Sequence, residues 1–147
     1  MNDARVDEGW VVVRGGAGKF AQEIAAGAHQ LPADEPVAAG GTATGPSPYD
    51  LLLAALGACA SMTVSMYARR KQWPLDHVTV RLRHSKHHAE DCAQCDTTEQ
   101  KLDRIERELE FRGSLADEQR ARLLEIANRC PVHLTLTSGM EIQTSLR

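Results

Sequence analysis

The chain has 147 residues, of which 42% are hydrophobic and 25% charged, the composition of one soluble globular domain over residues 1–147. Its formal net charge is −3, so it lacks the basic field that a nucleic-acid-binding protein needs. No stretch reaches the ~18 apolar residues of a membrane span. The first nine residues do not form a signal peptide, and four cysteines in such a chain indicate thiol chemistry or metal binding. We therefore expect a cytoplasmic protein without a nucleic-acid or membrane partner.

The N-terminal part predicts a small sheet over about residues 8–46. Trp10–Arg14 is rich in β-branched residues, and the glycine-rich Gly15–Gly18 separates it from Lys19–Ala25. This order is typical of a hairpin or meander. We expect a further strand around Val37, followed by a loop where Gly and Thr cluster.

The clearest predicted element is a central helix over about residues 48–71. Ser47 is a preferred N-cap, Pro48 is favoured at the first helical position, and Asp50 suits the first turn. The Trp73–Pro74 pair ends the helix, because the residue before a proline avoids the α region. Most side chains on the helix are apolar or small, which predicts burial on nearly every side. A chain of this size has few elements to cover such a helix.

The C-terminal part, about residues 76–147, predicts a mixture of strands and helices. Val78–Leu82 alternates apolar and polar residues, which is typical of a half-buried strand. Lys101–Arg112 fits either a strand or a helix, and the propensities of Glu and Arg favour the helix. A helix follows over Leu115–Arg129, and residues 142–146 fit a last short strand.

Two of the four cysteines lie in or next to predicted helices. Cys59 shares one face of the central helix with Leu56, and this position alone favours a core cysteine. Burial disfavours a thiolate, so a functional Cys59 needs a cation or a donor from another segment. Cys130 precedes Pro131, as in a helix N-cap, where free backbone N–H groups stabilise a thiolate, and His133 lies three residues on. A capping or packing role explains Cys130 equally well.

The other two cysteines belong to a segment rich in metal-ligating residues, of which we single out His84, His88, Cys92 and Cys95. Such a Cys-x-x-Cys pair with nearby histidines binds zinc or shuttles a disulfide. A solvated loop with incidental ligands accounts for the pattern as well. We therefore expect no cofactor, with zinc at this loop as the one metal hypothesis.

Two motifs in the chain resemble the OsmC/Ohr family. They are Gly45–Cys59, which contains Gly-Pro-Ser-Pro-Tyr-Asp, and Cys130–His133. With weaker similarity elsewhere, the resemblance covers about residues 9–147. It implies an α+β, OsmC-like fold in which two chains intertwine as a homodimer, with their sheets wrapped around paired central helices. The partner chain would then cover the apolar helix, and Lys101–Arg112 would be a strand.

The resemblance also implies an activity, the thiol-dependent reduction of organic hydroperoxides. By position, Cys59 matches the peroxidatic cysteine, which becomes a sulfenic acid. Cys130 matches the resolving cysteine, which condenses with it to a disulfide that a dithiol reductant then reduces. No cofactor is implied.

One position departs from the family pattern. Efficient peroxidases of the family carry a Glu ten positions before the first cysteine, where it orients an Arg that holds the thiolate. Tyr49 takes that position here, with Asp50 next to it. We take Arg14 as the candidate partner of the thiolate and expect Tyr49, Asp50 and His133 to support the site. The alternative function is an OsmC-fold ligand-binding or redox-sensing protein with little peroxidase turnover.

Overall fold

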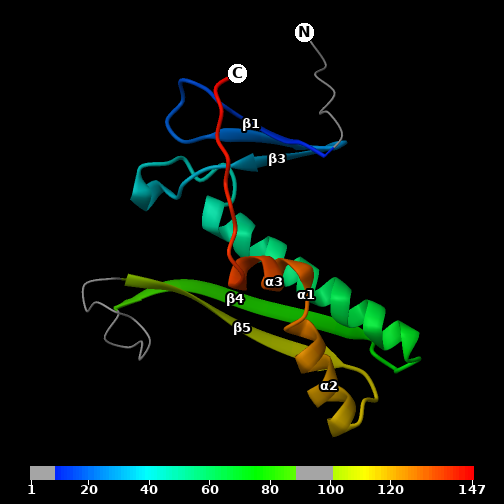
Figure 1. Ribbon diagram of the computed structural model, residues 1–147. Coiled ribbons are helices and arrows are strands. Elements are labelled where there is room, and N and C mark those ends of the chain that lie inside the picture. The colour runs from blue at the N-terminus through cyan, green and yellow to red at the C-terminus, as the bar shows by residue number, and fades with distance from the viewer. Residues whose placement is uncertain (1–8, 89–100) are drawn as a thin grey trace. The chain divides into compact units, whose positions relative to one another are not determined.

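The computed structural model describes residues 9–88 and 101–147 (Figure 1). The chain divides into two compact units, Met1–Leu52 and Leu53–Arg147, and each is described by itself. The single domain expected from the sequence stays a prediction.

The first unit contains a three-stranded antiparallel sheet in the order β1-β2-β3. The strands are β1 (Val11–Gly15), β2 (Gln22–Ala26) and β3 (His29–Ala33). A two-residue turn joins β2 to β3, and its Gly27 has a φ of 59°, a conformation that suits glycine. The predicted N-terminal hairpin or meander is thereby confirmed.

The strand predicted around Val37 is wrong. The third strand lies earlier in the chain, and Val37–Ala39 forms a 3₁₀ turn, η1. Pro36 offers no N–H to a β-ladder, and its carbonyl accepts hydrogen bonds from the amides of Ala39 and Gly41. The backbone therefore closes on itself instead of pairing with β3.

The loop after β3 is organised around the buried carboxylate of Asp34, which is 2% exposed. The carboxylate accepts hydrogen bonds from the backbone N–H groups of Glu35, Thr42 and Thr44, at 2.7, 3.2 and 3.2 Å. The hydroxyls of Thr42 and Thr44 donate to it as well. These bonds, that from the Thr42 hydroxyl above all, hold the pKa of Asp34 well below its usual range against the opposing effect of burial.

We expect the substitution Asp34→Asn to destabilise the protein, because an amide cannot accept all of these hydrogen bonds. The urea midpoint at neutral pH should fall by about 1 M. Because the native pKa of Asp34 is lowered, its stabilisation is fully present above the ordinary Asp pKa of about 3.9 and is lost as the pH falls further.

Urea unfolding followed by circular dichroism at several pH values checks this expectation. Glu23→Gln, a change of the same kind on an exposed carboxylate, is the control. A difference between wild type and Asp34→Asn that stays constant from pH 7 to below about pH 3 would contradict the linkage argument.

The central helix, α1, spans Pro48–Arg70, one residue less than predicted at its C-terminal end. The Ser47 Oγ atom accepts a hydrogen bond from the Asp50 amide at 3.2 Å, and the Asp50 carboxylate accepts one from the Ser47 amide at 3.0 Å. This reciprocal arrangement is the capping box that satisfies free N–H groups at a helix start. It explains why the start of the helix could be predicted.

The described residues bury one face of α1. The buried residues recur at helical spacing and are Leu56, Gly57, Ala60, Val64 and Ala68. Met62 and Met66 remain 72% and 48% exposed, so residues 9–88 and 101–147 do not supply the predicted burial on nearly every side. Among the described residues, α1 is also the one helix long and apolar enough to cross a membrane, with a mean hydropathy of 1.7. The sequence analysis missed this property of the helix. Core helices of soluble proteins meet the same criteria, so the finding is weak evidence for a membrane span.

The second unit is built on a long antiparallel hairpin of β4 (His77–His88) and β5 (Lys101–Arg112), seen beside α1 in Figure 1. The strand that the family resemblance implied for Lys101–Arg112 is confirmed over the helix that its propensities favoured. Its charged residues pair across the exposed face of the hairpin, as Arg81 does with Glu108 at 3.1 Å.

The opposite face of the hairpin packs against α1 at close range. A Cβ atom on Gly57 would lie 2.8 Å from the Leu82 side chain, so the absence of a side chain at this position lets β4 approach the helix. The contact lies two residues before Cys59 in the sequence. It therefore fixes the distance between the sheet and the turn of α1 that carries this cysteine.

Two short helices complete the second unit, α2 (Asp117–Ala127) and α3 (Pro131–Thr137). The helix predicted over Leu115–Arg129 is confirmed with shorter ends. The strand predicted over residues 142–146 is wrong, because this segment has no regular structure and pairs with no strand in the described part of the chain. Ile142 is 81% exposed, so it gains no buried surface that would hold it in a sheet.

Candidate functional site

The two cysteines singled out from the sequence meet in one apolar cluster of the second unit. Its buried members are Leu56, Ala60 and Cys130, and its partly buried members are Cys59, Leu82, Ile105 and Val132. The cluster draws on α1, both strands of the hairpin, and the junction between α2 and α3. Residues far apart in the sequence thus place two sulfur atoms together in a water-poor environment.

The two thiols differ in their exposure. Cys59 lies on α1 and is half-buried, whereas the side chain of Cys130 is fully buried. Both are free thiols, and Cys59 packs against the cluster that contains Cys130. The Cys130 sulfur also accepts a hydrogen bond from the backbone N–H of His133 at 3.4 Å, which makes Cys130 the N-cap of α3. The capping role considered from the sequence is therefore present, together with a contact to the second cysteine.

The environment opposes ionisation of the Cys130 thiol. Burial raises the pKa of Cys130 above its ordinary value, and the hydrogen bond and charge interaction with Cys59 raise it further. The N–H of His133 and the charge of Arg107 act in the opposite direction and lower this pKa. The net shift is upward, so Cys130 is mainly protonated at neutral pH.

Arg107 is the residue of this site that the sequence analysis missed. It lies on β5 directly opposite Leu82 and points to the face of the hairpin that packs on the cysteine cluster. Its Nη2 atom donates to the Asn128 side-chain oxygen at 2.8 Å and lies 3.3 Å from Nδ1 of His133. The signal was the alternation of Ile105, Arg107 and Leu109, which in a strand places all three side chains on the inner face.

Of the residues predicted to support the thiols, His133 is brought to Cys130, as described above. Arg14, Tyr49 and Asp50 belong to the first unit and are described within it. Asp50 caps the start of α1, and Tyr49 is an exposed residue in its first turn. A role for these three residues at Cys59 stays a prediction.

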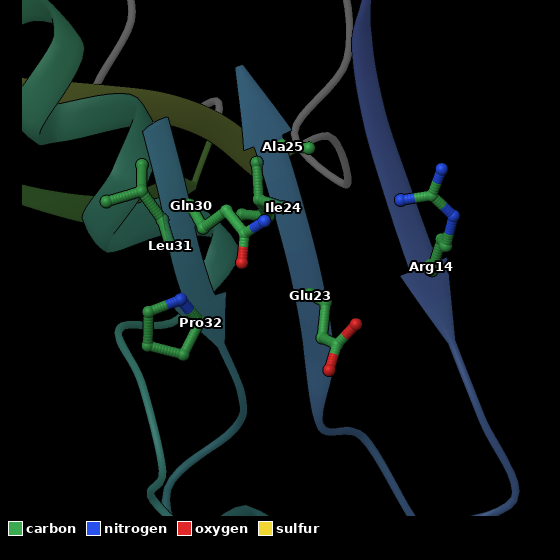
Figure 2. Close-up of a pocket in the computed structure, with 7 residues that line it drawn as sticks. All are labelled: Arg14, Glu23, Ile24, Ala25, Gln30, Leu31 and Pro32. Carbon is green, nitrogen blue, oxygen red and sulfur yellow. The ribbon is translucent and has the colours of Figure 1, made fainter. Parts of the chain in front are cut away.

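Arg14 borders a pocket of about 250 Å³ on the sheet of the first unit, shown in Figure 2. It lies opposite Glu23 in the β1–β2 register, and the pocket extends over β3. The residues that line it are Arg14, Glu23, Ile24, Ala25, Gln30, Leu31 and Pro32. Arg14 is thus paired with Glu23 in strand register, and both side chains line the pocket.

The predicted zinc ligands fall mainly outside the described residues, which include neither Cys92, Cys95 nor the side chain of His88. His84 lies on the inner face of β4, where its Nε2 atom is 2.7 Å from an oxygen of Asp103. This hydrogen bond lowers the pKa of Asp103. No group of three or more metal-ligating side chains occurs in residues 9–86 and 102–147. Zinc at the loop stays a prediction.

Comparisons with known proteins place the chain in a family. A family model described as OsmC-like protein matches residues 41–145, a range that includes both clustered cysteines. No curated protein matches the chain.

Several solved structures are similar to this chain. An organic hydroperoxide resistance protein OsmC from Legionella pneumophila aligns with a TM-score of 0.63 at 18% identity, covering 87% of this chain and 88% of that chain. The organic hydroperoxide resistance protein OhrB of Bacillus subtilis aligns with a TM-score of 0.60 at 21% identity, covering 87% and 89%. An OsmC-like protein from Mycoplasma pneumoniae aligns with a TM-score of 0.65 at 19% identity, covering 86% and 84%.

Identities this low show the fold alone, which is the α+β OsmC-like fold that the sequence motifs implied. The family model adds an independent match over most of the chain. The protein belongs to the OsmC family.

Proposed function

We propose that this protein is a thiol-dependent reductase of organic hydroperoxides, with Cys59 as the peroxidatic and Cys130 as the resolving cysteine. The observation that carries the proposal is the contact of two free thiols, from α1 and from the start of α3, inside an apolar cluster. Membership of the OsmC family supports it, as do the names of two similar structures as organic hydroperoxide resistance proteins.

The exposure of the two thiols supports this division of roles. A peroxide must reach the sulfur that it oxidises, and Cys59 is the more accessible of the two. The surrounding Leu82, Ile105 and Val132 side chains are apolar, so they suit the organic group of a hydroperoxide better than a small polar oxidant. Cys130, which is fully buried, is suited to react only with its neighbour.

The proposed cycle has three balanced steps. The Cys59 thiolate attacks the outer oxygen of the hydroperoxide, the O–O bond breaks, and the products are a Cys59 sulfenic acid and, after protonation, an alcohol. The Cys130 thiolate then attacks the Cys59 sulfur, forming a disulfide and releasing hydroxide, which takes a proton to become water. A dithiol reductant reduces the disulfide and is itself oxidised. The reducing cytoplasm expected from the sequence suits this last step.

We expect Cys59→Ser to abolish consumption of cumene hydroperoxide with a dithiol reductant, because the serine hydroxyl cannot become a sulfenic acid. Cys130→Ser should still allow one oxidation per chain and then stop, leaving Cys59 as a sulfenic or sulfinic acid. Mass spectrometry of the peptides after one equivalent of hydroperoxide measures these states.

Cys92→Ser and Cys95→Ser are the matched controls, and both should leave the first oxidation of Cys59 unchanged. A Cys59–Cys130 disulfide in the wild type supports the proposed pair. A Cys92–Cys95 disulfide with Cys59 still reduced would refute it. Formation of the Cys59–Cys130 disulfide without steady-state turnover would instead favour the alternative, a redox-sensing or ligand-binding protein of the same fold.

We also propose that the protein works as a homodimer. Ala55, Ala58, Met62 and Met66 form an exposed stripe of small and apolar side chains along α1. In the first unit, Val13 and Leu31 are exposed on one face of the sheet and flank Ile24 in its register. Exposed apolar surface of this extent is typical of a protein interface. A second copy of the chain would cover it, as the family resemblance implies.

Light scattering at micromolar concentration should therefore give twice the chain mass of 16.1 kDa. Met62→Lys should lower the measured mass or the yield of folded protein, because it buries a charge in the proposed interface. Leu124→Lys, at an exposed leucine of α2, is the control and should leave the dimer intact. A folded wild-type monomer at this concentration would overturn the proposal.

A further inference from the structure

The guanidinium of Arg107 has an unmet hydrogen-bonding requirement. Its Nη1 atom is buried and has no hydrogen-bond partner among the described residues. Buried polar groups are nearly always paired, and an unpaired group of a charged side chain is especially costly. An anion that forms near Arg107 during a reaction would supply the missing partner of Nη1.

Arg107 is held in a fixed place beside Cys130. Its Nη2 atom donates to Asn128, immediately before Arg129 and Cys130 in the chain, and lies 3.3 Å from Nδ1 of His133. The backbone N–H of the same His133 donates to the Cys130 sulfur. Since a guanidinium only donates, Nδ1 of His133 must accept, so a neutral His133 carries its proton on Nε2. Arg107 and Cys130 are thus linked through the residues on both sides of the cysteine.

Arg107 also brings a positive charge to the apolar cluster, whose own members carry none. Apart from the two cysteines, the members of the cluster that contains Cys130 are apolar. Arg107 enters from the inner face of β5, two residues after Ile105, which belongs to the cluster. The charge of Arg107 lowers the pKa of Cys130, in opposition to burial and to the Cys59 thiol. In a water-poor environment such an interaction is stronger than on the surface.

We propose that Arg107 is the positioning residue that prepares Cys130 for attack on oxidised Cys59. It acts by favouring the Cys130 thiolate through its charge and by holding His133 and Asn128 around the cysteine. In the step that it assists, the Cys130 thiolate attacks the sulfur of the Cys59 sulfenic acid, the S–O bond breaks, and hydroxide leaves with a proton from water or buffer. This role in resolution rests on the proposed peroxidase function, whereas its effect on the Cys130 thiolate does not.

The full-length chain with Cys59, Cys92 and Cys95 replaced by serine contains Cys130 as its single cysteine. Its pH titration, followed by the ultraviolet absorbance of the thiolate, reports Cys130 alone and requires no peroxide. We compare this single-cysteine parent with two variants of it. Arg107→Lys keeps the charge, and Arg107→Gln keeps hydrogen-bond donors without the charge. Arg81→Gln, at an exposed arginine of the same hairpin, is the matched control.

We expect Arg107→Gln to raise the titration midpoint of Cys130 by about one pH unit, which is about a tenfold loss of thiolate at a given pH below the midpoint. Arg107→Lys should stay close to the parent protein, and Arg81→Gln should not change the midpoint. An unchanged midpoint in Arg107→Gln, or an equal shift in the Lys and Gln variants, would overturn the proposal, because either result leaves no role for the charge. Circular dichroism verifies that each variant is folded. If Arg107→Gln does not fold, the Lys variant decides: a rise of the Cys130 midpoint by one pH unit in Arg107→Lys overturns the proposal.

A second measurement, in the chain with all four cysteines, tests the role in resolution. With excess cumene hydroperoxide, Arg107→Gln should accumulate several-fold more Cys59 sulfinic acid than the wild type or Arg107→Lys, because slower disulfide formation leaves the sulfenic acid exposed to a second peroxide. Equal sulfinic acid in all three proteins overturns the role in resolution. If Cys59 of the wild type is not oxidised at all, the proposed peroxidase function fails, while the titration still decides whether Arg107 acts on Cys130.

Discussion

The burial of two neighbouring thiols among apolar side chains is the constraint on which the site depends. A thiolate is the reactive form of cysteine, and burial disfavours it. Cys130 is fully buried next to Leu56 and Ala60, so each charge that forms there needs a compensating group within the same cluster. The hairpin supplies that group, since Arg107 is the cation whose charge acts on Cys130. Within the described part of the chain, the fold thus combines an apolar cluster with the positive charge of Arg107.

The two faces of the β4–β5 hairpin contribute differently to the structure. Pairs such as Arg81 and Glu108 lie on the exposed face, where ion pairs contribute little to stability because water and salt screen them. The inner face holds the hairpin against α1, and the missing side chain of Gly57 sets the separation of helix and sheet at the turn before Cys59. The position of Arg107 beside Cys130 follows from this packing. We infer that the hairpin serves the site chiefly as a rigid support.

Local signals predicted the parts of the fold that local interactions determine. Ser47, Pro48 and Asp50 marked the start of α1, where the structure forms a capping box, and Cys130 before Pro131 marked the N-cap of α3. Local signals could not predict the β-strand at Lys101–Arg112. Its helix-favouring residues are held extended by pairing with β4, a contact between segments distant in sequence. Arg107 was missed for the same reason, since its side chain reaches the cluster only when the segment is a strand. The turn at Val37 depends on backbone hydrogen bonds around Pro36, which no periodic pattern reveals.

The unequal burial of the two cysteines sets an order of events within the proposed cycle. In that cycle oxidation begins at the half-buried Cys59, and Cys130 is at hand for disulfide formation because both thiols belong to one cluster. The raised pKa of Cys130 makes its thiolate a minor species at neutral pH, so the rate of disulfide formation should rise with pH up to that pKa. The lifetime of the Cys59 sulfenic acid is then governed by the protonation of its neighbour. A residue that adjusts this protonation, as we propose for Arg107, therefore controls how often Cys59 is oxidised beyond recovery.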